Sequence, residues 1–394
     1  MTRVDELFRG AVGEGQVTGA VGMATARGGP SYVGAFGARS SVNSSRMTPD
    51  TLFEVSALLR PILAVAALQL VDAEMLGLDE PLRAVLPELA APRVLDGFDR
   101  TGVPELRPAS GEITLRRLLS HTAGFTVGSW WHGALVLEDL WSLPYRPGSV
   151  TLLADPGTRW LHCADTDLIA MVIERTSGLP MTEYLKSGIF RELGMLDTGF
   201  DVPHRSRARV AGGLGGAEDV LGYPSFYSTP RDYFEFVEAL LWRDESLLSP
   251  AASELLRSNQ TGSLRVPKVV DLAGVRTAGD INVYPEMRLY PNIGAQWSLG
   301  FMLNAEAVPD GPRAGSLSSA GNSHTFCWID PSSEVAGLVF LQPTEWRPAA
   351  GEQLFGEFQR SIYAERDARV RRGQSMPNGP DTWPVAPPPV WWPF

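Results

Sequence analysis

The chain has few cysteines, no long apolar segment and no excess of basic residues, and each absence excludes a class of protein. Its two cysteines, Cys163 and Cys327, are too few for a disulfide framework, so we expect buried, reduced thiols. No run approaches the roughly 18 apolar residues that a membrane-spanning helix needs. The formal net charge of −11 disfavours a nucleic-acid partner, which requires a basic surface.

The N-terminal residues lack the unbroken apolar core of a secretory signal, because Asp5, Glu6 and Arg9 interrupt it. We therefore predict a cytoplasmic protein. No pair among the five histidines has the i, i+4 spacing of a helical metal site, and neither cysteine lies in a C-x-x-C motif, so we expect neither zinc nor another cofactor. The chain has 394 residues, 44% of them hydrophobic and 20% charged, which is typical of a globular protein with a solvated acidic surface.

Hydrophobic periodicity predicts strands at both ends of the chain and helices between them. Residues 4–12 have helical spacing, and two β-rich runs follow as a hairpin. A long apolar helix is expected over residues 56–76, with Pro61 near its start. Further helices extend to about residue 296, and then come three strand-like runs, WSLGFMLN, HTFCWID and VAGLVFLQ, and a helix over 351–369.

This pattern predicts an α/β (α+β) fold with an antiparallel sheet flanked by helices. The sheet is assembled from both chain ends and carries a large, mostly helical insertion. The expected parts are a sheet region (1–75 and 291–370), a helical region (76–290) and a Pro- and Trp-rich extension (371–394). The extension should dock on its own domain, over the active site or on a second copy, because its tryptophans would be costly to leave in water.

Several motifs occur in the order known from one protein superfamily. They are TLFEVSALLRP, GLDEPLRAVLPEL, LLSHTAG, DPGTRW, VIERTSG and LGMLDTGF. Together they resemble serine β-lactamases, penicillin-binding proteins and their relatives, most closely class C β-lactamase-like esterases and 6-aminohexanoate-dimer hydrolases. The resemblance covers residues from about 15 to 345 and implies a β-lactamase/transpeptidase-like fold.

The first motif departs from the family pattern at two positions. The resemblance places Ala57 where the family has its serine nucleophile and Arg60 where it has lysine. A methyl group cannot be acylated, and a guanidinium stays protonated and has no lone pair to act as a base. Ser56 is the alternative nucleophile, although one step along a helix turns a side chain by ~100°. Its other interpretation is a helix N-cap.

The second and third catalytic elements are also changed. The family's tyrosine position holds His162, or Leu161 if the alignment has a one-residue gap. A histidine can transfer protons near neutral pH, although a packed, hydrogen-bonded histidine is equally consistent with the sequence. The family's Lys-Thr-Gly or His-x-Gly strand is matched by Ser319, Ala320 and Gly321, where only the glycine is retained. Ser319 is interpreted either as a ligand-binding hydroxyl or as a solvated turn residue.

Other residues are expected to border the family's active site. Asp165 follows the tyrosine position and is a polar candidate whose alternative role is helix capping; Asp167 is the weaker of the two. His121 matches a structural position of the family. Four tryptophans are expected either as walls for an apolar ligand or as core residues, namely Trp130, Trp131, Trp141 and Trp160.

Three functions from different classes fit these observations. The favoured hypothesis is non-covalent acid/base chemistry on a small molecule, a cyclisation, isomerisation or elimination in secondary metabolism. It uses His162 as acid or base, Arg60 as a fixed cation and Ser56 or Ser319 as donors. The second is an inactive relative that binds a ligand or partner. The third is a hydrolase or acyltransferase that uses Ser56 with His162.

Overall fold

The computed structural model describes most of the chain. The residues outside the description are 1–2, 27–31, 41–44, 102–103, 126–150, 163–165, 213–224, 265, 268–288, 322, 345–347 and 372–394, together with the side chains of residues 56, 98, 348, 349, 369 and 370. The C-terminal extension and its predicted docking therefore lie outside the described residues, as do Cys163, Asp165 and three of the four tryptophans named above.

A seven-stranded antiparallel sheet forms the centre of the protein, with strand order β2-β1-β12-β11-β10-β9-β8. The strands are β1 (Val17–Ala26), β2 (Tyr32–Gly37), β8 (Ala295–Trp297), β9 (Met302–Asn304), β10 (Leu317–Gly321), β11 (Thr325–Asp330) and β12 (Val335–Pro343). Strands from opposite chain ends are neighbours, since β1 pairs with β12 through partners such as Val21 and Phe340. The predicted antiparallel sheet built from both termini is confirmed.

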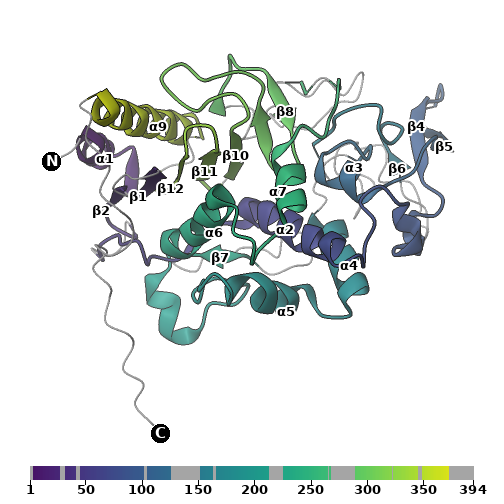
Figure 1. The fold of residues 1–394 in the computed structure, drawn as a ribbon, viewed down its shortest axis with the longest axis horizontal. Helices are drawn as coiled ribbons and strands as arrows, with labels where there is room; N and C mark the ends of the chain where they lie inside the picture. The colour runs from purple at the N-terminus through teal and green to yellow at the C-terminus, as the bar shows by residue number, and fades with distance from the viewer. Residues whose placement is uncertain are drawn as a thin grey trace, which may run out of the picture.

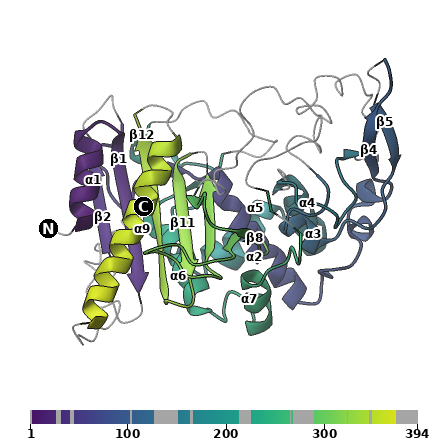
Figure 2. The ribbon, with the colours of Figure 1, turned by 90° about the horizontal axis from the view of Figure 1, so that it is seen from above.

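Helices cover both faces of this sheet (Figures 1 and 2). On one face, α1 (Arg3–Gly13) and α9 (Pro348–Arg371) pack together through Phe8 and Phe358, with Trp328 of β11 beneath them. On the other face, α6 (Pro230–Trp242) packs on β11 and β12, and α2 (Leu59–Asp72) lies beyond it. Helix α2 is buried nearly all round, which explains its almost continuous apolar sequence.

The middle of the chain contains the remaining helices and two small sheets. The helical elements are η1 (Ser56–Leu58), η2 (Leu82–Ala84), η3 (Pro87–Leu89), α3 (Leu115–Leu119), α4 (Thr166–Ser177), α5 (Met181–Leu185), the π-helical η5 (Lys186–Phe190), η6 (His204–Arg209) and α7 (Pro250–Arg257). Strands β4 (Arg93–Phe98), β5 (Pro104–Pro108) and β6 (Thr151–Leu152) form one small sheet, and β3 (Phe53–Glu54) and β7 (Tyr227–Ser228) form the other. The β4–β5 hairpin extends from the end of the molecule opposite α1 (Figure 2).

Local sequence sets where several of these elements begin and end. Thr229 accepts a hydrogen bond from the Asp232 backbone N–H at the start of α6, and Pro230 follows where a missing N–H costs little. The helix expected over 56–76 begins as a 3₁₀ turn and ends at Asp72. The run WSLGFMLN forms two strands rather than one, joined by a turn in which Gly300 has a φ of +93°.

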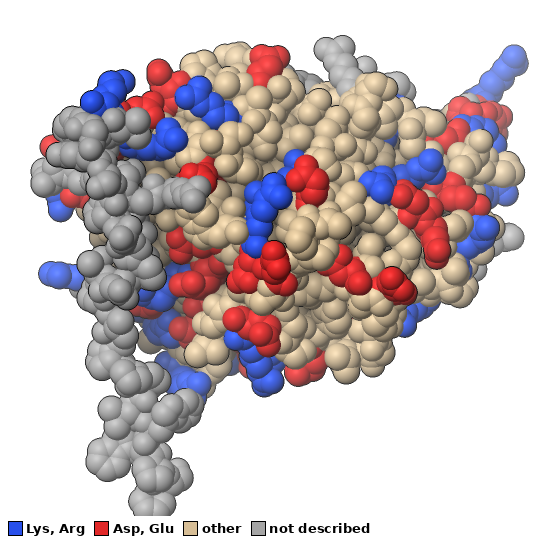
Figure 3. Space-filling view, viewed as in Figure 1, with Lys and Arg blue, Asp and Glu red and all other residues tan. Residues whose placement is uncertain are grey.

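No helix in the described part of the chain is long and apolar enough to cross a membrane. Acidic and basic side chains are interspersed over the face drawn in Figure 3. Cys327 is a buried free thiol, as expected. The cytoplasmic location stays a prediction.

Candidate functional site

Ala57 lies where η1 packs against the end of β10. A β-carbon added to Gly321 would be 3.0 Å from the Ala57 Cβ and 3.0 Å from Thr325 Oγ1, which is closer than ordinary van der Waals contact. The two backbones approach so closely that glycine is favoured at this point of β10. The structure thus brings together Ala57 and Gly321, which only the family alignment had connected.

Two buried contacts fix the position of η1. The Tyr233 hydroxyl on α6 donates to the Leu58 carbonyl oxygen at 2.9 Å, and the Val55 backbone N–H donates to the Phe226 carbonyl oxygen at 2.8 Å. Tyr233 is fully buried, and burial raises its pKa well above the usual value, so it remains a neutral donor. The turn that carries Ser56 and Ala57 is therefore held from the α6 side.

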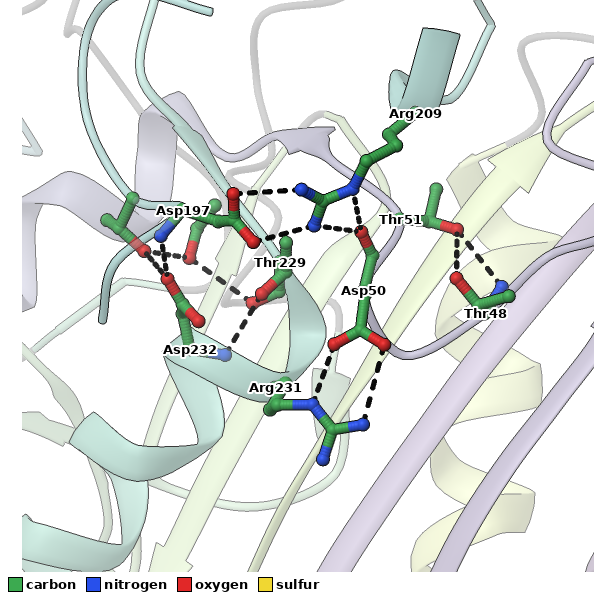
Figure 4. Close-up of polar contacts among 10 residues, drawn as sticks. Thr48, Asp50, Thr51, Asp197, Arg209, Thr229, Arg231 and Asp232 are labelled. Carbon is green, nitrogen blue, oxygen red and sulfur yellow. Dashed lines mark hydrogen bonds and ion pairs between the residues drawn. The ribbon is translucent and has the colours of Figure 1, made fainter. Parts of the chain in front are cut away.

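An ionic network anchors the segment that leads into β3 and η1 (Figure 4). Arg209 donates to the Asp50 carbonyl oxygen at 2.7 Å and to the Asp197 carboxylate at 2.7 and 2.9 Å. Arg231 donates to the Asp50 carboxylate at 2.7 Å. Asp232 accepts the Asp197 backbone N–H at 2.7 Å, so residues from three distant segments are joined. The network reaches the start of β3, a few residues before Ala57.

Arg60 and His162, which are far apart in the sequence, are in direct contact. Arg60 Nη1 lies 3.1 Å from His162 Nε2. A guanidinium can only donate, so the imidazole must accept at Nε2 and carry its proton on Nδ1. The two residues that the family alignment placed at the lysine and tyrosine positions therefore interact.

Three aromatic residues surround the imidazole of His162. The ring of His121 stacks on it with centroids 4.5 Å apart, and Trp297 and Trp160 lie 6.1 and 6.0 Å away. His121 and Trp297 also contact each other edge to face at 4.9 Å. Because both tryptophans are almost completely buried, this cluster holds the imidazole in one orientation.

The backbone ties this cluster together. The Leu161 N–H donates to the His121 carbonyl oxygen at 2.8 Å, which fixes the segment that bears His162 against the loop after α3. His121 itself has a left-handed φ of 58°, an unusual conformation for a residue other than glycine. The predicted structural role of His121 agrees with its complete burial and its packing.

Both imidazoles are held in the neutral state. Burial lowers the pKa of His162 well below 6.5, and the positive charge of Arg60 lowers it further. The pKa of His121 is lowered by burial, by Arg60 and by His162. His162 is only partly buried as a residue, but its Nδ1 atom is inaccessible to solvent.

The other predicted site residues are placed as follows. Ser319 lies within β10 and is 3% exposed, so its interpretation as a solvated turn residue is wrong. By strand alternation it shares a face with Gly321.

The side chain of Ser56, which begins η1, is outside the description, and so are Asp165, Trp130, Trp131 and Trp141. Trp160 is a core residue, and Asp167 is buried in the first turn of α4. Among the described residues, no group of three or more His, Cys, Asp or Glu side chains could hold a metal ion.

Comparison with known proteins identifies the family of this chain. The profile of the Beta-lactamase family matches residues 4–355. The chain belongs to the Beta-lactamase family. It is 28% identical to monacolin J acid methylbutanoyltransferase of Aspergillus terreus, over 92% of this chain and 95% of that one. It is 27% identical to lovastatin esterase of Penicillium rubens, over 93% of this chain and 99% of the esterase. The fold resembles unliganded simvastatin synthase of Aspergillus terreus, with a TM-score of 0.73, 27% identity and coverage of 93% and 98%.

These relatives correct the favoured functional hypothesis. Cyclisation, isomerisation or elimination by non-covalent acid/base chemistry is wrong, because relatives that match the chain over almost its whole length are an acyltransferase and an esterase of this family. Substitutions at individual motif positions therefore do not by themselves indicate a change of reaction class. Acyl transfer, the third of the hypotheses from sequence, agrees better with the comparisons.

Sequence reasoning missed three residues of the site. Trp297 was assigned only to a strand, Thr325 only to the start of another, and Tyr233 only to a helix. Trp297 and Tyr233 are placed by tertiary packing between segments far apart in the chain. The one available signal was the position of HTFCWID, which begins three residues after Gly321 in the sequence, and the structure pairs Gly321 with Thr325.

Proposed function

We propose that this protein is an acyl-transfer enzyme that moves a small acyl group from an ester to an acceptor hydroxyl or to water. The observation that carries the proposal is its similarity, over nearly the whole chain, to a methylbutanoyltransferase and an esterase. A short aliphatic acyl group on a small biosynthetic product is the substrate class that these relatives suggest. The reacting site lies around η1, the end of β10 and the Arg60–His162 pair.

Ser56 is the proposed nucleophile. It begins η1 and lies four residues before Arg60 in the sequence. The fixed positive charge of Arg60 would stabilise the negative oxygen that develops on the ester carbonyl during attack. The neutral imidazole of His162 keeps its lone pair on Nε2, the nitrogen that faces Arg60, and this nitrogen is the proposed proton acceptor.

The reaction then follows two steps. The Ser56 oxygen attacks the carbonyl carbon, its proton passes to His162 Nε2, and the ester oxygen leaves as an alcohol after receiving that proton. In the second step an acceptor hydroxyl or water gives its proton to His162 and attacks the acyl-serine. The Ser56 oxygen leaves and recovers the proton, which returns the enzyme to its starting state.

A second candidate function is a protein that binds the same class of acyl ligand without reacting with it. The observation that favours it is the methyl group of Ala57, which lies against Gly321 at the position matched to the family's nucleophile. Arg60 cannot replace the family's lysine as a base. In this case the Arg60–His162 pair and the aromatic cluster would serve recognition alone.

Covalent labelling distinguishes the two functions. The protein is treated with a fluorophosphonate and separately with p-nitrophenyl butyrate, and the modified peptide is identified by mass spectrometry. Acyl transfer predicts one adduct, on Ser56, that disappears in Ser56→Ala but persists in Ser187→Ala, which removes an exposed serine on η5. An unmodified protein that still binds butyrate would support the binding function instead.

A further inference from the structure

Arg60 occupies the nitrogen of His162 that acyl transfer requires. The 3.1 Å contact joins Arg60 Nη1 to His162 Nε2, and the guanidinium can only be the donor in it. The lone pair on Nε2 is therefore engaged in the structure. His162 can accept a proton at Nε2 only after this hydrogen bond breaks, because a protonated nitrogen has no lone pair for Arg60.

The surroundings of His162 make movement of Arg60 the simpler route to a free Nε2. The imidazole is stacked on His121 at 4.5 Å and enclosed by two buried tryptophans, Trp160 and Trp297. A change of ring orientation would disrupt these contacts. The Arg60 side chain has a long aliphatic stem and several rotatable bonds, so its head can change partner while α2 stays in place.

We propose that Arg60 blocks His162 in the ligand-free protein and that a carboxylate group of the substrate removes this block by taking over the Arg60 hydrogen bonds. This inference rests on the proposed acyl-transfer function. It names the substrate class of that function and the way in which substrate binding regulates the base. A substrate with an acyl ester and a separate carboxylate would therefore prepare the base as it binds. A neutral ester, such as the labelling reagent p-nitrophenyl butyrate, would not displace Arg60 from Nε2, so it would still react with Ser56 but more slowly than an ester that carries a carboxylate.

The relative strengths of the two partners of Arg60 support this exchange. A guanidinium can bind a carboxylate through two parallel hydrogen bonds in which both partners are charged, whereas neutral His162 offers a single uncharged acceptor atom. Arg60, from α2, and His121, from the loop after α3, are charged or titratable groups that face the His162 ring. A carboxylate on Arg60 also offsets the positive charge that lowers the pKa of His162.

Nuclear magnetic resonance of ¹⁵N-histidine-labelled protein tests the inference without any turnover. The His162 signals are assigned by their loss in His162→Asn, and the protein is titrated with butyrate and, in parallel, with neutral butyramide. We expect butyrate alone to move the Nε2 resonance of His162 and to raise its apparent pKa. Arg60→Met should show a free Nε2 before any ligand is added and no response to butyrate, whereas Arg60→Lys should keep a weaker response.

The same titrations with butyrate and butyramide also provide the control. Arg175 lies on α4 and forms an ion pair with Glu88 on η3. Arg175→Met should therefore respond to butyrate like the unmodified protein. The inference would be overturned if butyrate and butyramide had equal effects. It would also be overturned if the Nε2 resonance of His162 were the same in Arg60→Met as in the unmodified protein. Because labelling of Ser56 is measured separately, such a result leaves acyl transfer standing, and a butyrate response without any adduct would instead reject the reaction.

Discussion

The hydroxyl of Tyr233, on a helix packed against the central sheet, donates a hydrogen bond to the carbonyl oxygen of Leu58 at 2.9 Å. Both groups are buried, so this bond joins α6 to the turn that carries Ser56 and Ala57. It belongs to the machinery that positions the site and does not touch the reacting atoms.

Tyr233→Phe should destabilise the protein by about 1 to 2 kcal/mol, because the Leu58 carbonyl loses a buried donor. Labelling of Ser56 should slow as η1 becomes less fixed. Denaturant unfolding and labelling kinetics measure the two effects. Tyr184→Phe, which removes a hydroxyl from a partly buried tyrosine on α5, is the control. Unchanged stability in Tyr233→Phe would show that the bond contributes little.

Gly321→Ala should also disturb the site, because its new β-carbon would meet Ala57 Cβ and Thr325 Oγ1 at 3.0 Å each. We expect a loss of about 1 to 3 kcal/mol from overpacking. The double variant Gly321→Ala with Ala57→Gly should recover part of this loss, as a double-mutant cycle would reveal. Gly199→Ala is the matched control, since its β-carbon would meet nothing within 4 Å. Additive effects of the two substitutions would contradict the close contact.

Ala57→Ser combined with Arg60→Lys tests whether Ala57 occupies the family's nucleophile position. The double variant regains a hydroxyl one turn before a lysine that can act as a base. We expect hydrolysis of p-nitrophenyl butyrate to rise by about 100-fold over the unmodified protein, with the adduct on residue 57. Ala57→Ser alone should gain much less. An adduct that stays on Ser56 in the double variant would show that residue 57 is not aligned for attack.

The stability of the protein should fall as pH rises through about 6, because of Asp232. Burial raises the pKa of this carboxyl to about 6 from 3.8, although hydrogen bonds from the Asp197 N–H and Thr198 oppose the rise. A raised folded-state pKa gives stability that is fully present below the unfolded pKa and lost above the folded one. The difference is on the order of 3 kcal/mol.

Asp232→Asn should remove this pH dependence, since an amide does not titrate. Its carbonyl oxygen still accepts the Asp197 N–H, so the network in Figure 4 is largely kept. Unfolding free energies at pH 4.5 and 7.5 test the expectation. Glu245→Gln, which changes an exposed carboxylate just after α6, is the control. An equal pH dependence in the unmodified protein and Asp232→Asn would assign the effect to another group.

Much of the fold followed from local sequence. The opening helix and hairpin and the final helix were identified because periodicity and turn residues are local signals. The β4–β5 hairpin was missed, since its strands are partly exposed and mix charged with apolar residues. WSLGFMLN was predicted as one strand because the turn at Gly300 depends on a positive φ that the letters do not reveal.

The site was only partly predictable. The family alignment assigned both Ala57 and Gly321 to active-site motifs. No local sequence pattern predicts that Arg60 contacts His162 or that Trp297 packs against the His162 ring. These contacts connect segments separated by most of the insertion. The reaction class was predicted wrongly because it was inferred from substituted positions alone, whereas similarity over the whole chain points to acyl transfer.

The pairing of β1 with β12 has a consequence for how the protein is made on the ribosome. The first long strand emerges early, but its neighbour in the sheet, β12, is synthesised only after the whole helical region. Until then one edge of β1 and its apolar surface lack their native cover, a state that invites aggregation. Ending the chain before Val335 should therefore disrupt the whole sheet rather than trim one edge, because β12 lies between β1 and β11, and nascent chains need protection until β12 has been made.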